Sequence, residues 1–360
     1  MEELIREAPS SSDAYLVYAD WLQAQGNPRG ELIVLQQQGW EAKAQSYLAE
    51  HAAALLGPAL TDYQTSFDGM SMPAFDWRLG FIQSARLSYD SNCVDEVEVS
   101  GSHEDIHLEK ALAALLQHPS AMVLEELVLP INMLDDGCYF EPLLKAIAEH
   151  GAPALRRLRI GEFQVAGPGG VQNDYDYEIS WSGIGNASGA FSNMPELEYL
   201  RIQSGLGSHS CWDTPDDLGE MNLPKLRQLE VVTGGMNKTC LAAIAKASWP
   251  ELESMEVWLG SSDYGSDTSL DDLQPILDGT RLPKLKRLAL LNTELSDELC
   301  GTLAESKILP QLEVLHLSYG TMTDAGAQSL QANRAAFAHL KEIAVDANFL
   351  GTAGIEAVKG

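Results

Sequence analysis

One short pattern recurs along the C-terminal two thirds of this 360-residue chain and constrains its fold more than any other feature. The pattern is L-x-x-L-x-L, as in Leu312-Glu313-Val314-Leu315-His316-Leu317. It occurs eight times, and Ile, Val or Met takes some of the apolar positions: Leu124/Leu127/Leu129, Leu155/Leu158/Ile160, Leu197/Leu200/Ile202, Leu226/Leu229/Val231, Leu252/Met255/Val257, Leu285/Leu288/Leu290, Leu312/Leu315/Leu317 and Leu340/Ile343/Val345. A unit of this length cannot bury its apolar face alone, so the repeats must stack into a solenoid.

The spacing of the repeats predicts a strand and a helix in each. From Leu197 onward the first leucines are 29, 26, 33, 27 and 28 residues apart, which leaves room for a helix after each strand. Residues 295–303, 322–330 and 350–355 read directly as such helices, because Ser, Thr or Gly follows an apolar residue where a helix N-cap belongs.

These segments resemble the ribonuclease-inhibitor-like subfamily of leucine-rich repeats over about residues 120–360. The resemblance implies an α/β fold, a right-handed βα solenoid shaped like a horseshoe, with a parallel sheet on the concave face and helices outside. The asparagine that the subfamily places after the strand is present as Asn348, whereas Thr293 and Gly320 replace it in other repeats.

The N-terminal 60 residues are predicted to form a helical cap on the solenoid. Tyr18-Ala-Asp-Trp-Leu22, Gly26-Asn-Pro-Arg-Gly-Glu31 and Leu35-Gln36 resemble a short repeat-companion domain found ahead of repeats in myxobacterial and planctomycete proteins. That resemblance implies a bacterial interaction protein and supplies no catalytic residues.

The first helix of the cap carries an apolar stripe, Leu16, Val17, Trp21 and Leu22. We expect Tyr18 and Trp21 to form the core of the cap, and a docking surface is the alternative. The remaining organisation is a connector with a degenerate first repeat at 61–120, including a strand at 77–87, and then the solenoid at 121–360 with an insertion at 161–193.

Charges alternate along the repeats at the position after each first leucine. The eight residues are Glu125, Arg156, Glu198, Arg227, Glu253, Lys286, Glu313 and Lys341. In a parallel sheet these positions stack about 4.8 Å apart, so each charge would neighbour two of opposite sign. We interpret this pattern as a structural ladder that fixes the order of the repeats.

Alternate side chains of each strand are predicted to face away from the leucines, onto the concave face. One row would hold Glu126, Arg157, Tyr199, Gln228, Ser254, Arg287, Val314 and Glu342. A second would hold Val128, Arg159, Arg201, Glu230, Glu256, Ala289 and His316, and a third Gln203, Trp258 and Ser318. Because Arg, Tyr and Trp dominate interface energies, the candidate partner-binding residues are Arg157, Arg159, Tyr199, Arg201, Gln228, Glu230, Glu256, Trp258, Arg287 and His316.

The insertion adds three aromatic candidates, Tyr175, Tyr177 and Trp181, in a glycine-rich loop. Such loops often serve in recognition, and a loop packed against the solenoid is the alternative. The glycines do not form a phosphate-binding pattern, because no G-x-x-x-x-G-K-S/T is present.

A zinc-dependent hydrolase is the enzymatic alternative. His103-Glu104-Asp105-Ile106-His107 matches H-E-x-x-H, in which two histidines one helical turn apart bind zinc. Glu126 lies nineteen residues after His107 and would be a third ligand. Against this, the motif follows Gly101-Ser102 at a helix start, and the repeat pattern already claims Glu126 for a strand.

Composition limits the partner and the compartment. A net charge of −29 argues against nucleic acids and anionic membranes and favours a basic protein partner. Five scattered cysteines (Cys93, Cys138, Cys211, Cys240 and Cys300) favour free thiols in a cytoplasm. We expect no signal peptide and no cofactor.

The sequence therefore predicts a non-enzymatic scaffold for protein recognition, acting as an adaptor, a regulatory subunit or an inhibitor. Zinc hydrolysis and a purely structural spacer are the alternatives.

Overall fold

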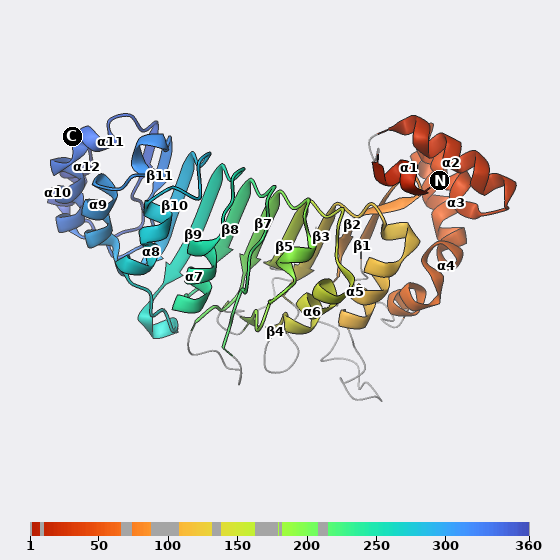
Figure 1. Ribbon diagram of the computed structural model, residues 1–360, viewed down its shortest axis with the longest axis horizontal. Coiled ribbons are helices and arrows are strands. Elements are labelled where there is room, and N and C mark those ends of the chain that lie inside the picture. Colours follow the sequence, from red (N-terminus) through yellow and green to blue (C-terminus); the bar gives the residue numbers. More distant parts are fainter. Residues whose placement is uncertain are drawn as a thin grey trace.

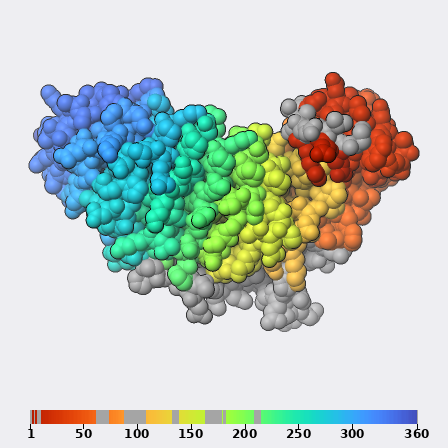
Figure 2. Space-filling view, in the orientation of Figure 1, coloured from red at the N-terminus to blue at the C-terminus, as the bar shows by residue number. Residues whose placement is uncertain are grey.

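The computed structural model describes residues 2–7, 11–65, 74–87, 108–131, 138–162, 179, 182–207 and 215–359. The chain is an α/β leucine-rich-repeat solenoid, in which strands stack side by side in chain order and helices follow along the other side of the sheet (Figure 1). The N-terminal helices and the last repeats lie at opposite ends of the long axis. Figure 2 shows that the outline is hollowed between these two ends.

Ten strands form one sheet, in the order β1-β2-β3-β5-β7-β8-β9-β10-β11-β12. Their bounds are β1 Ala74–Arg78, β2 Phe81–Arg86, β3 Glu126–Pro130, β5 Arg157–Glu162, β7 Tyr199–Gln203, β8 Gln228–Val232, β9 Ser254–Gly260, β10 Arg287–Thr293, β11 Val314–His316 and β12 Glu342–Ala344. Each strand pairs in parallel with the next, except that β1 and β2 are antiparallel. The short strands β4 (Cys138–Tyr139) and β6 (Ser182–Gly183) form a separate parallel pair.

The strand that the sequence suggested at 77–87 is wrong in its extent. Leu79 and Gly80 both have positive φ, 47° and 78°, and turn the chain between β1 and β2. Two successive left-handed residues are typical of a two-residue hairpin turn. Glycine or asparagine is common at both positions of such a turn, and the apolar Leu79 at the first position made it harder to predict, although Gly80 occupies the second.

Helices follow the strands in most repeats. They are α5 Leu108–Gln117, α6 Glu141–His150, α7 Lys238–Lys246, α8 Leu270–Leu277, α9 Ser296–Ala304, α10 Asp324–Ala332, α11 Arg334–Phe337 and α12 Thr352–Lys359, with 3₁₀ turns η3 Pro119–Ala121, η5 Phe191–Asn193, η6 Ser262–Tyr264 and η7 Leu309–Gln311. The three helices expected at 295–303, 322–330 and 350–355 are confirmed as α9, α10 and α12.

The repeated apolar triplets form the core. In the first seven repeats every triplet residue is at most 3% exposed. In the eighth, Ile343 is 39% exposed although its partner Leu315 on β11 is fully buried, because β12 is the last strand of the sheet. Burial of each triplet thus depends on the next repeat, as expected for a solenoid.

The alternating charges form the predicted ladder at the start of the strands. The Arg156 guanidinium lies 2.8 Å from the Glu198 carboxylate, and Arg227 lies 2.5 Å from Glu253. Further along, Glu313 contacts both Lys286 at 3.9 Å and Lys341 at 2.5 Å. The backbone of the same residues carries hydrogen bonds between repeats. The Glu198 carbonyl, for example, accepts from the N–H groups of Arg227 (2.8 Å) and Gln228 (3.0 Å).

The N-terminal helices are α1 Glu2–Glu7, α2 Ser12–Ala24, α3 Pro28–Gln37 and α4 Glu41–Thr65. The chain kinks within α4 at Gly57 (φ 69°), just before Pro58. The buried face of α2 is Tyr15, Tyr18, Ala19 and Leu22.

The expectation that Trp21 belongs to the core is wrong. Tyr18 is 4% exposed, but Trp21 is 46% exposed and stacks on the Tyr18 ring. Leu16 and Val17 are exposed as well, because helical spacing from Tyr15 and Leu22 turns them to the opposite side.

A buried arginine fastens the N-terminal helices to the first repeats. Arg29 donates hydrogen bonds to the carbonyl of Gly80 (3.0 Å) and to Ser120 Oγ (2.7 Å), and its guanidinium lies 4.8 Å from the Phe81 ring centroid. Burial lowers the pKa of Arg29. Ser120 in turn donates to the carbonyl of Leu55 on α4 (2.7 Å). One side chain therefore connects α3, the β1–β2 hairpin and η3, and Ser120 extends this link to α4.

A second buried polar group lies between the middle repeats. Asp216 is 1% exposed, and its Oδ1 accepts a hydrogen bond from the Gly185 N–H (2.8 Å), while Oδ2 has no hydrogen-bond partner among the described residues. Its backbone carbonyl accepts from Asn237 Nδ2 (3.0 Å) and from Cys240 Sγ (3.4 Å). Burial raises the pKa of Asp216 to about 6.

Replacing Arg29 by methionine tests its role as the fastening residue. Arg29→Met leaves the buried oxygens of Gly80 and Ser120 without their charged donor, so we expect the free energy of unfolding to fall by about 2–4 kcal/mol. Urea unfolding followed by circular dichroism measures it. The control is Arg156→Met, which removes an exposed arginine and should cost less than about 1 kcal/mol. Equal losses in the two variants would contradict this role.

Asp216 should make stability fall as pH rises from about 4 to 6. The folded pKa is raised above the unfolded value of about 3.9, so the folded chain binds more protons in this window. The full effect is roughly 3 kcal/mol. Asp216→Asn stays neutral and keeps an acceptor for Gly185. Between pH 4 and pH 7 the unfolding free energy of the variant, relative to that of the wild type, should therefore rise by about 2 kcal/mol. A constant difference across this range would disprove the assignment.

Candidate functional site

The pairing of the strands confirms the predicted rows of the concave face. In the first row each residue lies beside the next one on the neighbouring strand. The row runs through Glu126, Arg157, Tyr199, Gln228, Ser254, Arg287, Val314 and Glu342. The second row runs through Val128, Arg159, Arg201, Glu230, Glu256, Ala289 and His316. We use the name concave face for these two rows with Arg86, Glu162, Gln203, Trp258 and Ser318.

The arginines at the N-terminal half of this face are paired with carboxylates. Glu126 lies 3.8 Å from Arg157 Nε and 3.6 Å from Arg159 Nε, and Glu162 lies 3.1 Å from Arg159 and 2.8 Å from Arg86. The positive charge of these arginines is therefore largely neutralised by the neighbouring glutamates. The sequence could not show this, because Arg86 and Glu162 come from outside the predicted site residues.

Tyr199 and Arg201 continue the same network. Arg201 donates to Glu230 (2.7 Å) and to Gln203 Oε1 (2.9 Å), which fixes both ends of its guanidinium. The guanidinium of Arg157 lies 4.5 Å from the Tyr199 ring centroid, a cation–π distance. Tyr199 is only 8% exposed, and burial raises its pKa. The tyrosine thus supports the arginines and offers little surface of its own.

A second network occupies the C-terminal half. Arg287 lies 3.0 Å from Glu256 and 3.3 Å from His316 Nδ1, and His316 Nε2 lies 2.9 Å from Glu342. A guanidinium can only donate, so Nδ1 accepts and the proton sits on Nε2, which donates to Glu342. The neutral histidine satisfies both neighbours in this tautomer.

A stacked aromatic pair joins Trp258, on the concave face, to Tyr319, which follows β11. Their ring centroids are 5.3 Å apart at 19°, and Trp258 Nε1 donates to Glu256 (3.1 Å). Tyr319 is 55% exposed and has φ of 63°. Sequence reasoning missed Tyr319 because it follows the end of β11. The signal available was an aromatic residue in the turn before Gly320.

The three aromatic candidates of the insertion, Tyr175, Tyr177 and Trp181, lie outside the described residues, as do His103 and His107 of the H-E-x-x-H motif. Of the insertion at 161–193, Ile184 and Phe191 are described and fully buried. Gly161 (φ 81°) ends the regular part of β5, where a Cβ would come within 1.7 Å of the Gln203 carbonyl oxygen. At least part of the insertion therefore belongs to the solenoid core.

Glu126 is poorly placed to be a zinc ligand. Its carboxylate faces two guanidinium groups within 4 Å, Arg157 and Arg159. Among the residues that the structure describes, no group of three or more His, Cys, Asp and Glu could hold a metal ion. No described helix is long and apolar enough to cross a bilayer.

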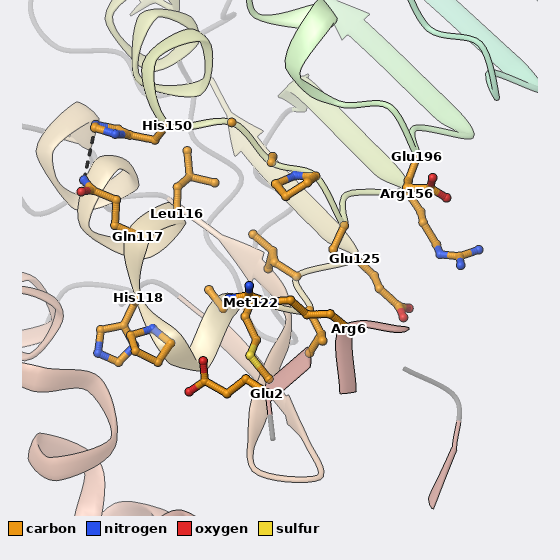
Figure 3. A pocket seen from close by; sticks show the side chains of 18 residues that line it. Glu2, Arg6, Leu116, Gln117, His118, Met122, Glu125, His150, Arg156 and Glu196 are labelled. Atoms are coloured by element: carbon orange, nitrogen blue, oxygen red, sulfur yellow. Dashed lines mark hydrogen bonds between the residues drawn. The ribbon is translucent and has the colours of Figure 1, made fainter. Parts of the chain in front are cut away.

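A cavity of about 680 Å³ lies away from the predicted site, at the rim where helices end and strands begin. Its lining comes from α1, the end of α5 and the residues before β3, β5 and β7. Figure 3 shows Glu2, Arg6 and His118 near one another. It also shows Gln117 beside His150, and the Nε2 atoms of these two residues are 3.4 Å apart. Burial lowers the pKa of His118. None of the sequence-predicted site residues lines this cavity.

Comparison with known proteins supports the fold and leaves the function open. No protein-family model matches the chain, and no curated protein matches its sequence. A crystal structure of a Bacteroides fragilis protein is 24% identical, with a TM-score of 0.56 over 71% of this chain and 68% of that one. Two other solved structures are more distant. An internalin from Listeria monocytogenes is 15% identical, with a TM-score of 0.32 over 68% of this chain and 67% of that one, and TLR13 in complex with ssRNA13 is 15% identical, with a TM-score of 0.34 over 68% of this chain and 31% of that one.

The zinc alternative has a direct test. We expect purified protein, incubated with zinc and then dialysed, to retain far less than one zinc ion per chain by plasma mass spectrometry. His103→Ala and His107→Ala should not change that content. One zinc ion per chain in the wild type, lost in both variants, would instead establish a metal site.

Proposed function

We propose that this protein binds another protein through the concave face of its sheet, without catalysing a reaction. The observation that carries the proposal is the paired network of the face, in which Arg86, Arg157, Arg159, Arg201 and Arg287 each lie within 4 Å of a glutamate. Arginine is enriched at protein interfaces. Side chains already held in place lose less conformational entropy when a partner binds.

The rigidity of the sheet supports the same proposal. Main-chain hydrogen bonds join each repeat to the next, as at Glu198 and Arg227 (2.8 Å). A surface built on paired strands keeps its geometry between the free and bound states, so rigid docking is the default expectation. The partner would match a preformed arrangement of charges.

Long-range charge favours a basic protein partner. The chain carries −29, while the paired arginines and glutamates of the concave face nearly cancel. The net field would attract a basic protein, and the local pattern would select its orientation. A nucleic acid or an anionic membrane would be repelled by the same field.

An adaptor, a regulatory subunit or an inhibitor that covers a partner's active surface would each use such a face. We also propose that the protein is bacterial and acts in the cytoplasm. Cys240 and Cys300 support the location, since both are free and fully buried, and burial raises the pKa of each thiol. Buried, unreactive thiols are typical of proteins that stay in a reducing compartment.

Comparative capture from the source cells tests the concave-face proposal. Wild-type protein and Arg201→Glu/Trp258→Ala are immobilised, and bound proteins are identified by mass spectrometry. We expect one abundant protein to be retained by the wild type and lost from the double variant, because the changes reverse a charge and remove an aromatic group on the face.

A swapped pair gives the matched control for stability. Arg201 and Glu230 form an ion pair at 2.7 Å. The variant Arg201→Glu/Glu230→Arg exchanges the two charges and so keeps an ion pair at this place. It should fold like the wild type but capture less partner. Lys307→Ala, an exposed residue paired with Asp278 away from the face, should capture normally. Equal capture by all variants would remove the concave face as the binding site.

A further inference from the structure

The concave face is divided by charge along the solenoid. From β2 to β8 its ionised side chains are four arginines and three glutamates: Arg86, Arg157, Arg159, Arg201, Glu126, Glu162 and Glu230. From β9 to β12, strands that the structure describes in full, Arg287 is the one arginine or lysine on the face, beside Glu256 and Glu342. The C-terminal half is therefore the acidic half.

The stacked pair Trp258–Tyr319 lies in this acidic half. Glu256 accepts a hydrogen bond from Trp258 Nε1, and the Tyr319 N–H donates to the carbonyl of Asp346 (2.9 Å), an exposed acid. Thr321, two residues after Tyr319, donates to the carbonyl of Glu294 (3.2 Å). Trp258 covers one side of the Tyr319 ring, and the tyrosine is still 55% exposed, so its other side is open.

Tyr319 holds a position where a tyrosine is unfavourable. The preceding and following repeats place Asn292 (φ 48°) and Ala347 (φ 54°) at the corresponding turn, so the turn itself requires left-handed backbone. Asparagine adopts this conformation more readily than an aromatic residue does. A strained, exposed aromatic side chain at such a position points to a role other than stability.

We propose that Trp258 and Tyr319 form a recognition site for an arginine side chain of the protein partner. The proposal rests on the protein-binding function above and names the chemistry of one contact. A guanidinium is planar, so it can stack on the open side of the Tyr319 ring, and its N–H groups can donate to the Glu256 carboxylate beside Trp258. The two glutamates of this half of the face, against the single Arg287, supply the charge complementarity.

The alternatives on this molecule are weaker. The exposed patch Leu16, Val17 and Trp21 on α2 is apolar, but no contact in the structure indicates what would cover it. The rim cavity near His118 mixes acidic and basic lining residues and selects no ligand class. Asp216 lies in the interior and does not line the rim cavity.

A peptide titration tests the site without the natural partner. The probes are N-acetylated, C-amidated tetra-arginine and tetra-lysine, which carry equal charge, titrated calorimetrically into the whole protein at about 0.15 M salt. The net charge attracts both peptides, so the informative quantity is the preference for arginine over lysine. We expect a preference of about tenfold in the wild type, from stacking on the aromatic pair.

Tyr319→Asn is the decisive variant, because it introduces the residue of the preceding repeat. It should abolish the arginine preference while the melting temperature stays equal or rises. The matched control is Trp21→Ala, which removes a second stacked pair of similar geometry (5.6 Å, 18°) at the other end of the molecule and should leave the preference intact.

Three results would overturn the proposal. They are no preference for arginine in the wild type, an unchanged preference in Tyr319→Asn, and a lowered melting temperature in Tyr319→Asn, which would make the tyrosine a packing residue. These failures are separate from failure of the proposed function. If Arg201→Glu/Glu230→Arg loses the partner but Tyr319→Asn does not change the peptide preference, the face binds a protein and the arginine site is wrong.

Discussion

The structure depends on hydrogen bonds that pass from one repeat to the next at the start of each strand. The carbonyl of one ladder residue accepts two N–H groups of the following repeat, as Glu253 does from Lys286 (2.8 Å) and Arg287 (3.0 Å). This connection fixes the register of neighbouring strands. Register then decides which side chains meet in the core and which meet on the concave face.

The fold and the rows of the face could be predicted because they follow from a period. Leucines at fixed spacing must share one side of a strand, so the alternate residues, such as Arg157 and Arg201, must share the other. The same reasoning predicted the ladder. Burial confirms the assignment of the two sides of the strands, since Leu158 and Leu200 are inaccessible while Arg157 and Arg201 are partly exposed.

Features that depend on one particular contact could not be predicted. The pairing of Arg159 with Glu162 depends on the register shift beside Gly161, and the stacking of Trp258 depends on the turn at Tyr319. Neither feature can be read from the spacing of the repeats. Trp21 was misassigned because an apolar side chain on a short helix can face either way. The sequence thus predicted which residues share the concave face, whereas the pairing of their charges required the three-dimensional structure.

The N-terminal motif has a structural explanation residue by residue. Asn27 accepts from the Arg29 N–H at the start of α3, where Pro28 takes a first-turn position. Arg29 reaches across to Gly80 and Ser120. Gly30 allows α2 and α3 to touch, since a Cβ there would lie 2.7 Å from the Ala19 carbonyl oxygen. Together these contacts hold α3 against α2 and against the first repeat.

The alternating ladder also restricts how the array can change in length. Removing one internal repeat would bring two ladder residues of the same sign together at the new junction, for example Arg156 beside Arg227 if the repeat of Glu198 were lost. Removing two adjacent repeats would restore opposite signs. The solenoid therefore has a parity: its charges favour growth and shortening in steps of two repeats, although each repeat is a single structural unit.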